Sequence, residues 1–152
     1  MIDIFADFRG VVIAALGGLA TAGVLPGGLD LGRVAVEPPR DPAHGDLSTN
    51  AAMVLARPLK QIPMALAERI GAAVQGRTLS SGDYHGSGFA VEAARPGFLN
   101  IRLKPAVFGE ILKSALREGA LFGAGLDKAE TEKINVEYVS ANPTGPMHVG
   151  HG

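Results

Sequence analysis

Residues 89–103 read Phe89-Ala-Val-Glu-Ala-Ala-Arg-Pro-Gly-Phe-Leu-Asn-Ile-Arg-Leu103. Two runs with the character of β-strands, 89–93 and 98–103, flank the triplet Arg95-Pro96-Gly97. A Pro-Gly pair between two such runs is typical of a hairpin, although the sequence does not fix the turn type. We therefore predict two antiparallel strands here.

Helical patterns surround this hairpin on both sides. Apolar residues recur at helical spacing, and we expect four helices, around residues 4–19, 51–55, 64–74 and 108–116. Pro63 and Pro105 suit the first turns of the third and fourth helices. Asp46 or Ser48 is expected to cap the second helix, because both side chains accept hydrogen bonds from free N–H groups.

The remaining segments before residue 120 complete an α+β domain. Residues 33–37 contain two valines before Pro38-Pro39, which favours a short strand, and residues 38–45 read as a loop. The predicted architecture is a small, largely antiparallel sheet packed with helices.

The composition limits the classes of function. The 152 residues carry a net charge of −1 and no cysteine, which argues against a polybasic nucleic-acid arm and excludes a disulfide framework. The apolar run 11–25 is too short to cross a bilayer, and Asp3 and Asp7 oppose the positive charge that a signal peptide needs. We read it as part of a buried helix and expect a cytoplasmic protein without membrane contact.

A change of composition marks a domain boundary near residue 120. Residues 121–133 contain Gly123, Gly125 and a charged run, as a connector would. We therefore expect an N-terminal domain over 1–120, a connector over 121–133 and the start of another domain over 134–152.

The last nineteen residues carry the strongest indication of chemistry. Residues 134–139 read as a strand, which leads through a Gly/Pro-rich turn to His148-Val-Gly-His151. Gly150 lets a nucleotide approach the backbone without a Cβ in the way, and the two imidazoles offer N–H donors to phosphate oxygens. The motif favours a nucleotide site. A metal site is not expected, because the two histidines lack acidic or cysteine partners nearby.

Three stretches together resemble one enzyme family. Ser140-Ala-Asn-Pro-Thr-Gly-Pro-Met-His-Val-Gly-His151 resembles the ATP-binding signature of class I aminoacyl-tRNA synthetases, specifically arginyl-tRNA synthetase. Pro42-Ala-His-Gly-Asp-Leu-Ser-Thr-Asn-Ala-Ala-Met53 and Pro96-Gly-Phe-Leu-Asn-Ile-Arg-Leu103 resemble stretches of that family's appended N-terminal domain. The resemblance implies that residues 134–152 begin a truncated Rossmann-type catalytic domain.

Several roles in the catalytic domain follow from the resemblance alone. His148, Gly150 and His151 match the positions that bind ATP. Ser140 and Asn142 match positions that help to hold arginine. The implied reaction joins arginine to tRNA(Arg) through arginyl-adenylate, with Mg²⁺ and ATP. The isolated chain is expected to be catalytically incomplete, and the parent enzyme is expected to be a monomer.

The resemblance also implies an RNA-reading role for two residues of the hairpin. Phe98 offers a ring for a splayed base of the tRNA D-loop, and Asn100 offers an amide for the edge of that base. Asn100 alternates with Leu99 and Ile101, so its side chain should face solvent. Two other interpretations stay open, namely a core role for Phe98 and a plain surface role for Asn100.

Two alternatives of other classes explain part of the same sequence. A nucleotidyltransferase could use His148-Val-Gly-His151 on a similar fold, although such enzymes normally carry the motif near their own N-terminus. A stand-alone RNA-binding module without catalysis would account for the first 120 residues but leaves residues 140–151 unexplained.

Overall fold

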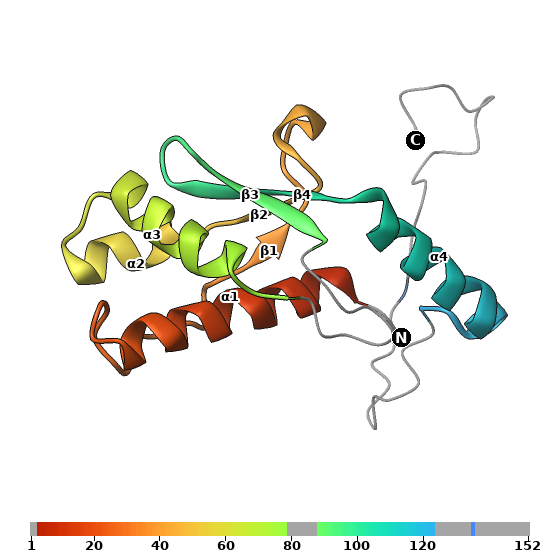
Figure 1. Ribbon diagram of the computed structural model, residues 1–152, viewed down its shortest axis with the longest axis horizontal. Coiled ribbons are helices and arrows are strands. Elements are labelled where there is room, and N and C mark those ends of the chain that lie inside the picture. Colours follow the sequence, from red (N-terminus) through yellow and green to blue (C-terminus); the bar gives the residue numbers. More distant parts are fainter. Residues whose placement is uncertain (1–2, 79–87, 124–134, 136–152) are drawn as a thin grey trace. The chain divides into compact units, whose positions relative to one another are not determined.

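The computed structural model describes residues 3–78, 88–123 and 135 (Figure 1). One compact unit comprises Met1–Phe122, and Gly123–Gly152 form a second unit. The predicted strand over 134–139 and the motif after it lie outside the described residues, apart from Asn135. The Rossmann-type part of the fold prediction therefore stays a prediction.

A four-stranded antiparallel sheet organises the first unit. The strands are β1 (Val36–Glu37), β2 (Leu47–Thr49), β3 (Phe89–Ala94) and β4 (Phe98–Leu103), in the order β1-β2-β4-β3. The predicted hairpin is confirmed as β3 and β4, with Ala94 opposite Phe98 and a cis peptide bond between Arg95 and Pro96. The strand predicted over 33–37 is shorter than expected, because only its last two residues pair with β2.

Three helices cover one face of this sheet (Figure 1). The described residues of the unit form the α-helices α1 (Ile4–Thr21), α2 (Ala51–Leu59), α3 (Pro63–Gln75) and α4 (Pro105–Glu118). Helices α2 and α3 pack on β4, α3 also packs on β3, and α1 packs against α3 and β1. The core between them contains Phe8 and Phe89, whose rings meet edge to face with centroids 4.7 Å apart. The predicted α+β architecture is confirmed for this unit.

Helix α1 is long and apolar enough to cross a membrane by length and composition. In the folded unit its apolar stripe instead joins the core, where Phe8, Val12 and Ala15 are fully buried. Arg9 lies within the helix and donates from Nε to the carbonyl of Val34 at 2.8 Å. These contacts support the prediction of a core helix.

The prediction that Asp46 or Ser48 caps the second helix is wrong. Ser48 lies within β2, and Asp46, the residue before this strand, accepts a hydrogen bond from the Leu103 backbone through Oδ2 at 2.8 Å. Helix α2 begins after Asn50, whose Oδ1 accepts from the Ala35 backbone instead of capping the helix. Instead of capping a helix, the side chains of Asp46, Ser48 and Asn50 form hydrogen bonds that join β2 and its flanking residues to Leu103, Asn100 and Ala35.

Helix α4 confirms the prediction at Pro105, and its C-cap is Gly119 with φ of 57°. Its predicted apolar stripe is largely exposed, with Phe108, Leu112 and Leu116 each at least 48% accessible. The residues that α4 buries are Val107 and Ser114.

Gly45, which lies two residues before β2, comes too close to β4 for a side chain. Its φ is +123°, and a Cβ at this position would lie 2.7 Å from the carbonyl oxygen of Ile101. We expect Gly45→Ala to lower the free energy of unfolding by about 1–3 kcal/mol from backbone strain, with the steric conflict adding to that loss. Urea denaturation of the chain measures it.

Gly27→Ala is the matched control, because a Cβ at Gly27 meets no atom within 4 Å. Equal stability of the Gly45→Ala and Gly27→Ala variants would contradict the close approach of β2 to β4.

Candidate nucleic-acid interface

The candidate RNA-reading residues lie on the face of the sheet that the helices leave open. Along β4, Leu99 and Ile101 are fully buried, whereas Phe98 is 36% exposed. Alternation along a strand places Phe98, Asn100 and Arg102 together on the outer face. Phe98 is thus not a core residue, and Asn100 faces outward as predicted.

Asn100 occupies the middle of a row of polar residues across this outer face. Strand pairing aligns Glu37 of β1 with Ser48 of β2, Ser48 with Asn100, and Asn100 with Glu92 of β3. The Ser48 hydroxyl donates to Oδ1 of Asn100 at 3.1 Å. Both members of this hydrogen bond are half-buried, whereas Glu37 and Glu92 are exposed.

The end of β4 beyond Asn100 is fixed by the turn before β2, a 3-10 helix over Pro42–His44. Asp46 donates from its backbone N–H to the Ile101 carbonyl at 2.8 Å. Arg102 donates from Nη2 to the carbonyl of Ala43, also at 2.8 Å. The two upstream stretches that carried the family resemblance are thus neighbours in space, because one supplies β2 and the other β4.

The side chain of Phe98 is partly accessible on the outer face, at 36% exposure. Its partner across the hairpin is Ala94, whose methyl group is too small to cover a phenyl ring. The Asn100 amide lies two residues farther along the same strand and on the same face. An exposed aromatic side chain and an amide on the same face of a strand are suited to stacking an unpaired base and binding its edge.

Charge on the outer face favours a base over a phosphate in the polar row. The carboxylates of Glu37 and Glu92 stand at its two ends and repel an anion. Cationic side chains lie beyond it instead: Arg95 in the hairpin turn and Arg102 and Lys104 toward the end of β4 are all exposed. These positions suit a nucleic-acid backbone that passes around the row.

The sequence did not point to Ser48 or Glu92 as members of this face. Their positions follow from the register of β2 and β3 against β4. A three-residue strand is too short to display the alternation that marks a strand in sequence. The other predicted site residues, His148, Gly150, His151, Ser140 and Asn142, lie outside the described residues.

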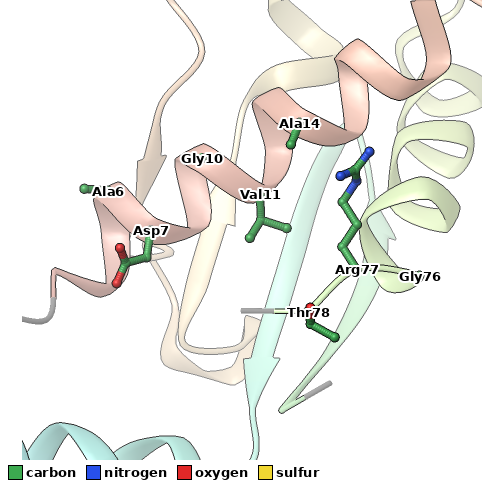
Figure 2. A pocket seen from close by; sticks show the side chains of 8 residues that line it. All are labelled: Ala6, Asp7, Gly10, Val11, Ala14, Gly76, Arg77 and Thr78. Atoms are coloured by element: carbon green, nitrogen blue, oxygen red, sulfur yellow. The ribbon is translucent and has the colours of Figure 1, made fainter. Parts of the chain in front are cut away.

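A hollow of about 700 Å³ lies on the helical side of the sheet, beside α1 (Figure 2). Figure 2 shows Asp7 and Arg77 at separate places along it, with Gly10 and Val11 between. One carboxylate oxygen, Oδ2 of Asp7, is buried there and has no hydrogen-bond partner among the residues that the structure describes. These two charged groups do not converge on a common point, so the outer sheet face is the better candidate site.

Comparison with known proteins agrees with the fold of the first unit. The family model "Arginyl tRNA synthetase N terminal domain" matches residues 10–103, which run from α1 to the end of β4. Arginine–tRNA ligases of Methylobacterium nodulans and Parvibaculum lavamentivorans are 53% and 54% identical over 99% and 98% of this chain. That of Cereibacter sphaeroides is 51% identical over 98% of it. The chain spans 24% of the length of each of these relatives. The chain belongs to the arginyl-tRNA synthetase family and corresponds to the N-terminal portion of the family's members.

Proposed function

We propose that this chain supplies the tRNA-reading part of an arginine–tRNA ligase and binds an unpaired base of the tRNA(Arg) D-loop on the outer face of its sheet. One observation carries the proposal: Phe98 is exposed on the same face of β4 as Asn100, whereas Leu99 and Ile101 on the opposite face are fully buried. A base stacks on the ring and forms hydrogen bonds with the amide. Specific contacts are needed, because a net charge of −1 gives no general attraction for RNA.

The reaction proposed for the full-length protein is the formation of arginyl-adenylate from arginine and ATP, followed by transfer of arginine to the tRNA. Residues His148, Gly150 and His151 are proposed to bind ATP, for which Mg²⁺ is the usual counter-ion. Ser140 and Asn142 are proposed to hold arginine. Family membership supports these assignments.

The proposed layout of the chain places the tRNA-reading domain in residues 1–120. A connector over 121–133 leads to the start of the catalytic nucleotide-binding domain over 134–152. The 152 residues span 24% of the length of the relatives, and we propose that they are inactive by themselves. The full-length enzyme is proposed to act as a cytoplasmic monomer.

The RNA contact can be tested with Phe98→Ala in the full-length enzyme. Loss of one stacked base weakens binding by about 1–3 kcal/mol, so the KM for tRNA should rise roughly five- to a hundredfold. The maximal rate at saturating tRNA should change little, because the ring does not touch the reacting groups. Asn100→Ala should have the same effect to a smaller degree. Steady-state aminoacylation over a range of tRNA concentrations separates the two constants.

Phe5→Ala is the matched control, since Phe5 is 37% exposed and lies on α1 rather than on the sheet. It should lower the melting temperature about as much as Phe98→Ala and leave the KM for tRNA unchanged. An unchanged KM in Phe98→Ala, or a rise of equal size in Phe5→Ala, would show that the sheet face does not bind the tRNA.

A further inference from the structure

The hydrogen bond between Ser48 and Asn100 determines which atoms of the amide are free. The Ser48 hydroxyl donates to Oδ1 of Asn100 at 3.1 Å. Within the part of the chain that the structure describes, the Nδ2 group of Asn100 has no hydrogen-bond partner. The amide therefore presents two N–H donors outward, while its oxygen is already engaged.

Backbone pairing fixes this contact from both sides. Ser48 and Asn100 are directly opposite residues of antiparallel strands, and such residues place their side chains next to each other. The neighbours of Ser48, Leu47 and Thr49, are each 1% exposed, so β2 cannot slip by one residue without exposing the core. Ser48 is thereby held within reach of the amide oxygen.

An amide without such a partner has two orientations that differ by a half-turn and have nearly the same shape. One presents the NH₂ group and the other presents the oxygen. A base edge that offers acceptors is bound by the first orientation and repelled by the second. The Ser48 hydroxyl holds the amide in place before the RNA arrives, which reduces the ordering required on binding, and in the structure it donates to Oδ1 and so leaves Nδ2 for the base.

We propose that Ser48 is a positioning residue for base recognition: it holds the Asn100 amide so that Nδ2 faces acceptor atoms of the bound base. This inference rests on the proposed function, since it requires that Asn100 contacts the tRNA. Ser48 itself acts through Asn100 and does not touch the base.

The test is a double-mutant cycle in the full-length enzyme with tRNA(Arg) transcript as the probe. Ser48→Ala should weaken tRNA binding about three- to tenfold, the range expected for the loss of one net hydrogen bond. Ser48→Thr keeps the hydroxyl and suits a strand, so its affinity should be restored to within about twofold of wild type. In an Asn100→Ala background, Ser48→Ala should have no further effect.

The preference of the enzyme for one D-loop base over another is a second measurement. A purely structural role of Ser48 would leave this preference unchanged. Transcripts with single base changes in the D-loop should be distinguished less well by Ser48→Ala, whereas Ser48→Thr should retain the wild-type preference. The melting temperatures of the two variants are measured alongside.

Each outcome has one interpretation. If Asn100→Ala weakens binding and Ser48→Ala does not, the positioning role is wrong while the proposed function stands. If Ser48→Ala has the same effect with and without Asn100, Ser48 does not act through the amide and the inference is overturned. If Asn100→Ala itself leaves binding unchanged, the inference fails together with the role of Asn100 in the proposed function.

Discussion

Replacing Ile101 with alanine is expected to lower the free energy of unfolding of the chain by about 2–5 kcal/mol, the range for removing a large aliphatic side chain from a packed core. Ile101 is fully buried in β4, a strand flanked on both sides, and is paired with Leu47 of β2 and Val91 of β3. A cavity left by this side chain is bordered by residues of β2, β3 and β4. Since small domains are stable by about 5–15 kcal/mol in total, the loss is a large fraction of the whole.

Urea denaturation of the 152-residue chain measures this loss, with Ile101→Val as the graded control. The valine variant removes one methyl group and should cost about 0.5–1.5 kcal/mol. Leu116→Ala is the exposed control, because Leu116 is 74% accessible on α4. If Ile101→Ala were no more destabilising than Leu116→Ala, the inner face of β4 would not be the core.

The second large effect is expected at the proposed ATP site. In the full-length enzyme, each imidazole is proposed to donate one hydrogen bond to the charge that develops on the α-phosphate. Replacing His148 or His151 with alanine should then raise the activation free energy of adenylate formation by about 2–4 kcal/mol, which lowers the rate roughly 30- to 900-fold. Arginine-dependent exchange of pyrophosphate into ATP, measured with saturating arginine and tRNA, reports this step.

Phe98→Ala serves as the control for that experiment. Its exchange rate at saturating tRNA should stay near that of wild type, whereas the histidine variants should keep the wild-type affinity for tRNA. Full exchange activity in either histidine variant would remove the assignment of that residue to the ATP site.

The hairpin and most helices were predictable because their signals are local. Residues 89–103 contain both strands and the turn that joins them, so the pairing of β3 with β4 needs no distant information. Pro63 and Pro105 likewise mark helix starts within a single turn of chain.

Strand β2 was missed because its cause is not local. Asp46 and Ser48 have the side chains of helix caps, and three residues are too few to reveal a strand period. What makes this segment a strand is β4, about fifty residues later, together with the close approach that Gly45 permits. The same dependence hides the Ser48–Asn100 contact, which exists only in this register.

Helix α4 illustrates a different limit of the sequence. The spacing of Phe108, Leu112 and Leu116 predicts a helix with an apolar stripe, and the helix is present. Periodicity does not tell which element covers a stripe, and within the described residues this stripe stays exposed.

The proposal that the outer sheet face reads an unpaired D-loop base is tested most directly by combining a protein change with an RNA change. Binding of the full-length enzyme and its Phe98→Ala variant is measured with tRNA(Arg) transcripts in which each D-loop nucleotide in turn is made abasic. At one D-loop position, loss of the base should weaken binding to wild type by about 1–3 kcal/mol and should have almost no further effect on Phe98→Ala. If every abasic transcript weakened binding to both proteins equally, Phe98 would not contact the D-loop and the account would be wrong.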